Sequence, residues 1–268
     1  MAAISMVTCY DYTSAKILDA AGIDYVLVGD SLGMTMLGYD STLRVTMADM
    51  ISHSAAVSRG IKSAKIIVDM PFMSYHTSTD EAVHNAGRLM QEGFADMVKL
   101  EGGVEFAPVI KAIVRASIPV CAHIGLTPQS VKAFGGFKVQ GKDIESAEKI
   151  IADALAVQEA GATMVVLEGI PTRLAKIITD LLTIPTIGIG AGNVTDGQVL
   201  VWQDLLGLNT DFRPKFVKQY LNAAELIDGA LKLYADEINT RSFPSDEYAF
   251  SINDEIIATL EKKYVNDL

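Results

Sequence analysis

Cysteine is scarce in this sequence, with two residues in a chain of 268. Cys9 and Cys121 each lie within an apolar stretch, and no CxxC or CxxH spacing occurs in the sequence. Zinc sites and redox dithiols require paired ligands at such spacings. The sequence therefore predicts two buried, reduced core thiols, which suits a cytoplasmic protein without disulfides.

Positive charge is also scarce, because 22 Lys and Arg residues face 33 Asp and Glu residues, which gives a formal net charge of −11. No cluster of Lys or Arg offsets this average, and a negative field repels the phosphate backbone of nucleic acids. We therefore expect no nucleic-acid partner. An anionic small-molecule substrate would need local cations or a metal ion to hold it.

Long apolar runs are missing as well. No segment reaches about 18 consecutive apolar residues, the length that a membrane-spanning helix needs. Residues 1–10 have no basic region and only a short apolar run, so they do not resemble a signal peptide. The sequence thus predicts a cytoplasmic protein that does not contact a membrane.

Apolar residues as a class are plentiful, at 50% of the chain with a mean hydropathy of +0.27. A chain of this length can bury a large core, and a one-domain barrel of about 250 residues fits it. The high hydropathy indicates either a generous core or surfaces buried between subunits, so we expect a homo-oligomer.

Short apolar runs recur after helical stretches that end in Gly or a small turn. The runs are continuous rather than alternating, which is typical of parallel strands buried on both faces. They predict eight strands, at residues 5–10, 25–28, 65–68, 97–100, 120–123, 164–167, 186–189 and 199–201. The clearer helical patterns between them cover residues 46–59, 79–92, 104–116, 143–159 and 172–182.

This alternation predicts an α/β fold, a (β/α)₈ TIM barrel, in one catalytic domain that covers residues 1–250 and includes C-terminal helices. The gap at 190–198 is too short for a full helix, so a doubly wound open sheet stays open as an alternative. Beyond Arg213 an amphipathic helical pattern runs to about Leu233. A further helix is expected at 253–264, within a C-terminal extension at 251–268 that serves packing or oligomer contacts.

Polar side chains stand where five of the predicted strands end, namely Asp30, Asp69, Glu101, His123 and Glu168. The carboxyl ends of parallel strands meet at the face that carries the active site. Any one of these acids alone is better explained as a helix cap or a solvated loop acid. Four carboxylates in one register, however, repel each other unless a cation joins them. An all-oxygen set with one His favours Mg²⁺ over Zn²⁺ and leaves one acid as a general base.

Lys99 precedes Glu101 by two residues, so their side chains share one face of a strand and point into the barrel. A buried Lys among carboxylates must be paired. Two roles stay open for Lys99. It either balances the charge of the core, or it holds a substrate carboxylate or stabilises an enolate.

Two glycine-rich segments lie near these strand ends. Residues 188–192 lack the full nucleotide-binding fingerprint, and we interpret them as a tight backbone turn that lines the mouth of the site. Residues 135–141 are flanked by glycines and predict a mobile loop or a short hairpin over the barrel.

Six segments in this order resemble the ketopantoate hydroxymethyltransferase family, with VGDSLG at 28–33, DMPF at 69–72, KLEGG at 99–103, HIGLTPQ at 123–129, KVQG at 138–141 and IGIGAG at 187–192. The likeness runs from about Thr8 to Phe250. It implies a TIM barrel of the phosphoenolpyruvate/pyruvate superfamily, Mg²⁺, and 5,10-methylenetetrahydrofolate as one-carbon donor. It also implies hydroxymethyl transfer to 3-methyl-2-oxobutanoate through a metal-stabilised enolate, on the route to pantothenate, by homo-oligomers that are often decamers.

The resemblance further implies roles for individual residues. The family positions that surround the metal are matched by Asp30, Asp69 and Glu101. Those that contact the oxo acid are matched by Asp30, Ser31, Asp69 and Lys99, and a further active-site position is matched by His123. The proton acceptor is matched by Glu168.

Four positions depart from the family's usual residues, with Gly169 for Cys, Ala122 for Gly, Arg44 for Pro and Gln203 for His. Gly169 directly follows the proposed base, and we expect it to loosen the position of Glu168. A superfamily C–C lyase or phosphomutase acting on a 2-oxo acid would share the barrel and its acids, so it stays open as an alternative. A non-enzymatic assembly protein has no reason to keep four acids and a Lys at strand ends.

Overall fold

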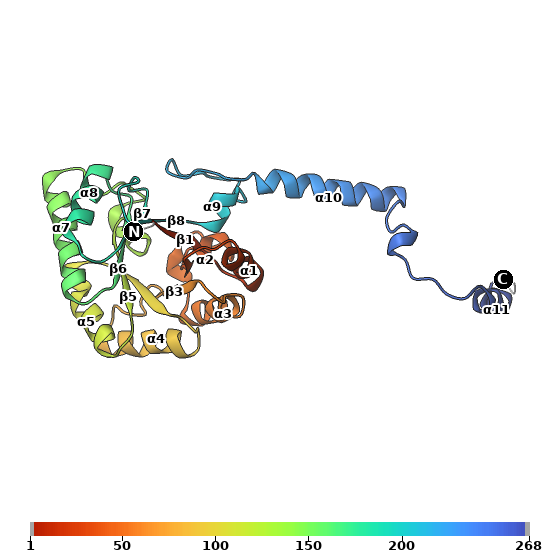
Figure 1. Ribbon diagram of the computed structural model, residues 1–268, viewed down its shortest axis with the longest axis horizontal. Coiled ribbons are helices and arrows are strands. Elements are labelled where there is room, and N and C mark those ends of the chain that lie inside the picture. The colour runs from red at the N-terminus through yellow and green to blue at the C-terminus, as the bar shows by residue number, and fades with distance from the viewer. Residues whose placement is uncertain (1–2, 266–268) are drawn as a thin grey trace. The chain divides into compact units, whose positions relative to one another are not determined.

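The computed structural model describes residues 3–265, and its first unit, which ends at Leu221, is a closed barrel of parallel strands in chain order (Figure 1). The strands are β1 Ile4–Thr8, β2 Tyr25–Val28, β3 Lys65–Asp69, β4 Met97–Glu101, β5 Val120–Gly125, β6 Met164–Glu168, β7 Thr186–Ile189 and β8 Gly197–Leu200. β1 pairs with β8, with Met6 opposite Val199, and this pairing closes the sheet. The predicted TIM barrel and its eighth strand are therefore confirmed, and the open-sheet alternative is wrong.

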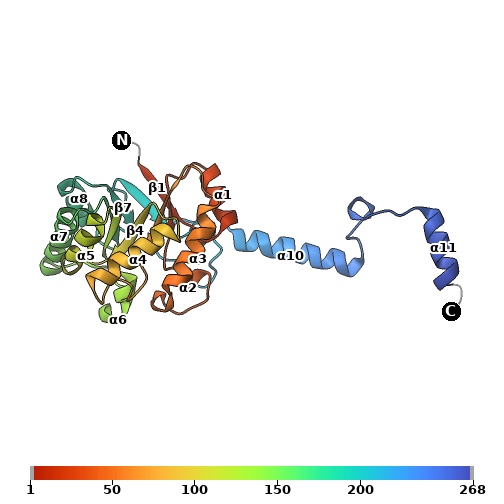
Figure 2. The same ribbon diagram turned by 90° about the horizontal axis from the view of Figure 1, so that it is seen from below.

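Helices cover the outside of the barrel, as Figure 2 shows for α3, α4, α5 and α7. The helices of this unit are α1 Tyr12–Ala20, α2 Leu32–Thr35, α3 Met47–Ser58, α4 Thr79–Gln91, α5 Ala107–Arg115, α6 Val131–Phe134, α7 Ile144–Glu159, α8 Thr172–Leu181 and α9 Trp202–Leu206. Short 3-10 turns are η1 Thr42–Arg44, η2 Val104–Phe106 and η3 Pro128–Ser130. The described residues 190–196, which join β7 to β8, form no helix, as expected from the short interval between the last two predicted strands.

Capping boxes define where two of the barrel helices begin. At α3, Thr46 Oγ1 accepts a hydrogen bond from Asp49 N, and Asp49 Oδ2 accepts one from Thr46 N. Asp143 and Ser146 exchange the same pair of bonds at α7. Such caps satisfy backbone groups that have no partner in the first turn of a helix. The loops that lead from the strands to α3 and α7 therefore end at defined residues.

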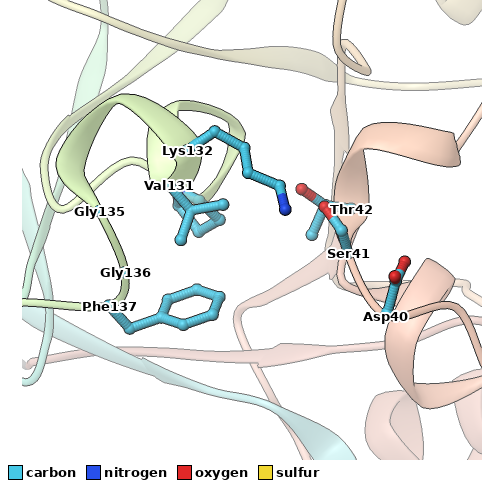
Figure 3. Close-up of a pocket in the computed structure, with 9 residues that line it drawn as sticks. Asp40, Ser41, Thr42, Val131, Lys132, Gly135, Gly136 and Phe137 are labelled. Atoms are coloured by element: carbon cyan, nitrogen blue, oxygen red, sulfur yellow. The ribbon is translucent and has the colours of Figure 1, made fainter.

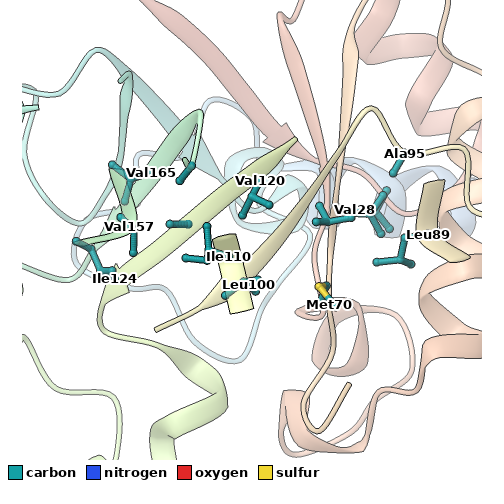
Figure 4. Close-up of a cluster of buried hydrophobic side chains, with 14 of the residues drawn as sticks. Val28, Met70, Leu89, Ala95, Leu100, Ile110, Val120, Ile124, Val157 and Val165 are labelled. Carbon is teal, nitrogen blue, oxygen red and sulfur yellow. The ribbon is translucent and has the colours of Figure 1, made fainter. Parts of the chain in front are cut away.

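Buried apolar side chains form two layers around the sheet. The larger cluster lies between strands and helices and includes Val28, Leu100 and Leu89 (Figure 4). The smaller cluster comes from the opposite face of the strands, with Met6, Leu27, Ile67, Cys121, Met164, Val166, Ile187, Ile189 and Val199. Side chains thus fill the barrel interior, as in other TIM barrels, so a site has room only at the strand ends. Both thiols are buried and free, as predicted.

From Asn222 onward the chain forms a second compact unit, with α10 at Ala223–Thr240, the turn η4 at Asp246–Tyr248 and α11 at Asp254–Tyr264. The helix expected at 253–264 is confirmed. The helix expected from residue 213 is wrong at its start, because residues 213–222 are irregular and α10 begins ten residues later. Pro214 disfavours a helix at this point, and the main-chain N of Tyr220 donates to Leu205 O of the barrel unit at 2.9 Å.

We expected the C-terminal helices up to residue 250 to form one domain with the barrel. By its internal contacts the barrel unit ends at Leu221, before α10 begins. Within residues 3–265, no helix is both long enough and apolar enough to cross a bilayer.

Candidate active site

The charged residues predicted at the strand ends lie together at one end of the barrel. Asp69 and Glu101 end β3 and β4, His123 lies in β5, and Asp30 follows β2. Parallel pairing places Asp69 opposite Lys99 and Glu101 opposite His123. All five residues are buried, with exposed fractions of 3–4%. They form a polar layer above the apolar interior of the barrel.

Lys99 is paired with acids, as a buried lysine requires. Its Nζ lies 2.8 Å from Asp69 Oδ1. Burial disfavours the charged ammonium, but attraction by Asp69, Glu101 and Asp30 outweighs this effect and raises the pKa of Lys99. Lys99 therefore stays protonated and supplies a positive charge within the site.

The buried carboxylates are short of positive partners. Burial, together with repulsion by Asp69 and Glu101, raises the pKa of Asp30 well above its ordinary value. Burial also raises the pKa of Asp69, although Lys99 opposes the rise. A raised carboxyl pKa means that the charged form is poorly stabilised, so a further cation at this place would be bound favourably.

His123 lies between two of the acids. Its Nδ1 is 3.3 Å from Glu101 Oε1, and its Nε2 is 3.1 Å from Glu168 Oε2. Burial and Lys99 lower the pKa of His123, but the pull of Glu101 and Glu168 outweighs them and raises it to about 9. A ring protonated on both nitrogens cannot accept a hydrogen bond from Lys99, whose Nζ is 3.2 Å from Nδ1. We therefore infer that the Lys99 ammonium donates to Asp69 and that the Nδ1–H of His123 donates to Glu101.

Gln129 in η3 is a site residue that the sequence argument did not single out. Its Nε2 donates to Asp30 Oδ2 at 2.8 Å, and its main-chain N donates to Glu101 Oε2 at 2.9 Å. Tyr75 OH donates in turn to Gln129 Oε1 at 2.7 Å. The side-chain amide of Gln129 thus fixes Asp30, and its main-chain N–H fixes Glu101. Gln129 belongs to the 123–129 segment on which the resemblance rests. Apart from that resemblance, a glutamine after a strand does not indicate a site residue.

Ser31 stands at the start of α2, beside a second residue that was missed. Its Oγ lies 2.9 Å from the hydroxyl of Tyr10. Burial raises the pKa of Tyr10 to about 12, so the phenol stays protonated. Tyr10 was placed at the end of the first predicted strand, and a polar aromatic at that position was the available signal.

Glu168 ends β6 and is less buried than the acids opposite it, since its side chain is 17% exposed against 3% for Glu101. Gly169, the departure expected to loosen it, has a φ of 57°, which glycine adopts without strain. Its N donates to Ile189 O at 2.9 Å, and its O accepts from Gln140 N at 2.9 Å. The backbone after Glu168 is therefore held on both sides.

The predictions for the two glycine-rich segments had different outcomes. Residues 188–192 make the expected tight turn, with φ values of 62° at Gly190 and 82° at Gly192. Residues 135–141 form an irregular loop without strands, so the hairpin alternative is wrong, and the mobility of the loop stays a prediction.

Whether the residues suit a divalent metal ion follows from their donors and charge. Within residues 3–265, no three His, Cys, Asp or Glu side chains are arranged as a ready metal cage. Mg²⁺ needs only one or two carboxylates, because it keeps waters or substrate oxygens as its other ligands. Asp30, Asp69 and Glu101 offer buried oxygen donors. The donor set therefore fits Mg²⁺ in an open coordination.

A family model and two curated relatives of this chain point to one family. A family model described as ketopantoate hydroxymethyltransferase matches residues 1–246. The 3-methyl-2-oxobutanoate hydroxymethyltransferase of Clostridium kluyveri is 60% identical over 254 residues, which cover 95% of this chain and 91% of that protein. The protein of the same name from Enterococcus faecalis is 58% identical over 261 residues, which cover 97% and 94%.

Solved structures share the barrel at low sequence identity. A phosphonopyruvate hydrolase complex with oxalate and Mg²⁺ has a TM-score of 0.60 and 13% identity, and the match covers 98% of this chain and 94% of that one. A 2,3-dimethylmalate lyase of the PEP mutase/isocitrate lyase superfamily has a TM-score of 0.56 and 16% identity, with 99% and 93% covered. These likenesses concern the fold alone.

Proposed function

The chain belongs to the ketopantoate hydroxymethyltransferase family, and from this premise we propose how its barrel end carries out the reaction. It is an enzyme that transfers a hydroxymethyl unit to 3-methyl-2-oxobutanoate and so makes ketopantoate for pantothenate biosynthesis. We propose 5,10-methylenetetrahydrofolate as the donor and Mg²⁺ as the cofactor. The buried acids beside the less buried Glu168 are the observation that carries this mechanism.

Asp30, Asp69 and Glu101 are the proposed metal ligands. When bound, Mg²⁺ supplies a Lewis acid that stabilises negative charge on the oxo acid, an effect worth several kcal/mol. The support on the chain's side is the excess of buried acid, expressed in the raised pKa values of Asp30 and Asp69. Gln129 positions two of the three carboxylates through the hydrogen bonds described above.

The oxo acid is proposed to bind on the polar layer, in contact with Asp30, Ser31, Asp69, Lys99 and His123. Lys99 and His123 are the cations of this layer, and an oxo acid brings a carboxylate that cations hold. Of the two roles left open for Lys99, its ion pair with Asp69 supports charge balance in the free protein. The same ammonium can stabilise the negative oxygen that develops during the reaction.

Glu168 is the proposed general base, which removes the proton from the β-carbon of the oxo acid. A positioned base contributes roughly 10²–10⁴-fold to the rate. The β-carbon then attacks the methylene carbon of the folate donor, a new C–C bond forms, and the bonds from the methylene carbon to folate nitrogens break. One water supplies the hydroxyl group of the product, the folate nitrogens take the other proton of this water and the proton that Glu168 removed, and tetrahydrofolate leaves.

The mechanism is tested by deuterium uptake at the β-carbon of 3-methyl-2-oxobutanoate, followed by proton NMR in D₂O. We expect exchange that depends on Mg²⁺, and a hydroxymethylated product once the folate donor is added. Product without Mg²⁺ would contradict the metal role, and exchange without product in the presence of the donor would contradict folate as the one-carbon source.

The lyase and phosphomutase alternatives have support from fold alone. The phosphoenolpyruvate phosphomutase and the 2,3-dimethylmalate lyase share 12% and 16% identity with this chain, whereas the Clostridium kluyveri hydroxymethyltransferase shares 60%. No contact in the site favours the alternatives over the transferase.

We further propose that the enzyme is a cytoplasmic homo-oligomer, with ten copies as the expected number. The support is apolar surface on α10, where Leu226 and Leu231 are each 62% exposed and Tyr234 is 55% exposed. A subunit interface would cover such side chains. Light scattering should give about ten times the chain mass of 28.8 kDa. A monomer mass would contradict the proposal.

A further inference from the structure

A cavity of about 310 Å³ lies beside the site, between η1 and the segment formed by α6 and the loop after it (Figure 3). Asp40 and Thr42 stand on one wall, while Val131 and the ring of Phe137 stand on the other. Lys132 extends its ammonium across the cavity toward Thr42. The cavity therefore has one polar wall and one apolar, aromatic wall.

The cavity shares its loops with the carboxylate site. Pro128 lines the cavity, and Gln129, the next residue, holds Asp30 and Glu101. The other wall belongs to the segment that follows α2, and Ser31 lies between the end of β2 and the start of α2. A ligand in the cavity therefore lies at the same end of the barrel as the oxo acid.

One polar atom of the wall has no hydrogen-bond partner among residues 3–265. Thr42 is 4% exposed, and its Oγ1 is buried without a hydrogen bond. Leaving a buried hydroxyl unpaired costs free energy, which a ligand with a polar edge recovers. Phe137, in contrast, is 61% exposed, which leaves an aromatic face free for stacking. A ligand that fits both walls has a polar edge and a flat apolar face, and a heteroaromatic ring has both.

We propose that this cavity binds the pterin ring of the one-carbon donor, an inference that rests on the proposed folate dependence. A pterin carries two adjacent N–H donors, on N3 and the 2-amino group, which match the carboxylate of Asp40. Its C4 oxygen is an acceptor, which matches the ammonium of Lys132. The ring face stacks on Phe137, and the methylene carbon, next to the ring, points to the oxo acid.

Volume and charge agree with a ring rather than a whole folate. Small-molecule sites span roughly 300–1,000 Å³, so a cavity of about 310 Å³ holds one ring system. The glutamate tail then reaches the rim. There Arg44 Nε lies 3.6 Å from Asp40 Oδ1, and Lys138 Nζ would lie 3.5 Å from a Cβ placed on Gly135. These cations suit carboxylates in a chain that is otherwise acidic.

The test uses two variants of the full-length enzyme, Phe137→Ala and Lys132→Gln. Binding of tetrahydrofolate and of 6-methyltetrahydropterin, which has no tail, is measured by calorimetry under reducing conditions. Loss of stacking should weaken both ligands by about tenfold in Phe137→Ala. Phe212→Ala, at a 70% exposed phenylalanine outside the cavity, and Lys111→Gln on α5 are the matched controls and should bind both ligands as the wild type does.

Deuterium exchange at the oxo acid, measured without folate, reports whether each variant keeps an assembled carboxylate site. Exchange together with weakened binding of both pterin ligands supports the proposal. Wild-type affinity in both cavity variants overturns it while the transferase assignment stands. Weakened tetrahydrofolate binding with unchanged 6-methyltetrahydropterin binding also overturns it, because the cavity would then hold the tail. A wild-type enzyme that neither binds tetrahydrofolate nor forms product overturns the folate proposal and this subsite together.

Discussion

The two ends of the barrel use the same residue type in opposite ways. At the amino ends of the strands, Asp24 directly precedes β2 and accepts a hydrogen bond from the main-chain N of Ser5 in β1 at 2.8 Å. Asp96 before β4 does the same for Ile66 in β3 at 2.9 Å. A third clamp of this kind joins the last two strands, where Asp196 before β8 accepts a hydrogen bond from the main-chain N of Thr186 in β7 at 2.9 Å.

Environment separates these aspartates from those at the carboxyl ends. Asp24 is exposed, and hydrogen bonds from Ser5 hold its pKa below the ordinary value. Asp30 is buried, and burial with repulsion by neighbouring acids raises its pKa. A carboxylate whose charged form is already stabilised holds the architecture, whereas one that lacks stabilising partners is available to a ligand. The comparison predicts that matched substitutions at the two ends change different properties.

The largest expected effect is on catalysis at the carboxyl ends. Glu168→Gln removes the proposed base with little change in shape, so kcat should fall by roughly 10²–10⁴-fold while calorimetry still detects oxo-acid binding. Asp96→Asn, at the amino ends, should leave kcat unchanged. Proton NMR of deuterium exchange measures the step directly. Wild-type exchange in Glu168→Gln would mean that another group takes the proton.

A second difference concerns two lysine–aspartate pairs. Lys99 and Asp69 are buried, at 5% side-chain exposure each, whereas the Lys65–Asp96 pair is exposed, at 62% and 42%. Removing one partner of a buried pair costs about 3–5 kcal/mol, but an exposed pair contributes about 0–1 kcal/mol. Urea unfolding of Lys99→Met and Lys65→Met measures both. Equal losses would show that burial does not distinguish the two ends.

Two glutamines allow a smaller test of the same comparison. Gln129 holds Asp30 and Glu101, while Gln158 Oε1 accepts from the main-chain N of Thr183 and of Ile184, just before β7. Gln129→Ala removes the side-chain hydrogen bond to Asp30 and keeps the main-chain bond to Glu101, so it should lower kcat/KM by about tenfold, as loss of a side chain that orients a metal ligand does. Gln158→Ala should lower the free energy of unfolding by about 1 kcal/mol and leave kcat/KM unchanged. A similar drop in kcat/KM for both variants would contradict a positioning role for Gln129.

The sequence predicted the carboxyl end well because that prediction needed only strand direction. Once the strands are parallel, residues that follow a strand converge, so Asp30, Asp69, Glu101 and Glu168 could be grouped without coordinates. The same rule places Asp24, which precedes its strand, at the opposite end of the barrel. The clamps it forms could not be predicted, since they depend on which backbone N–H each neighbouring strand presents.

The parts that sequence reasoning missed depend on distant partners. Gln129 and Asp30 are separated by 99 residues, and Tyr75 and Gln129 by 54. The prediction of a helix from residue 213 was wrong for a related reason. Phe216 packs against Gly190, where an added Cβ would lie 3.0 Å from its ring, so barrel contacts override the local helical pattern.

The smallest expected effect is a dependence on pH at the amino ends. The pKa of Asp24 is lowered from its ordinary value of 3.8 by hydrogen bonds from Ser5. The stabilisation from this shift is therefore complete above pH 3.8 and is lost as pH falls through the lower folded-state pKa. Asp24→Asn keeps the shape but removes the charge, so its free energy of unfolding should be below the wild-type value by about 1 kcal/mol at neutral pH, with a smaller gap in acid. Urea unfolding at neutral and at acidic pH measures the gap, with Asp211→Asn, at an exposed aspartate outside the clamps, as control. A gap that widens in acid would mean that Asp24 acts through something other than its ionised carboxylate, and the contrast between the two ends would then rest on burial alone.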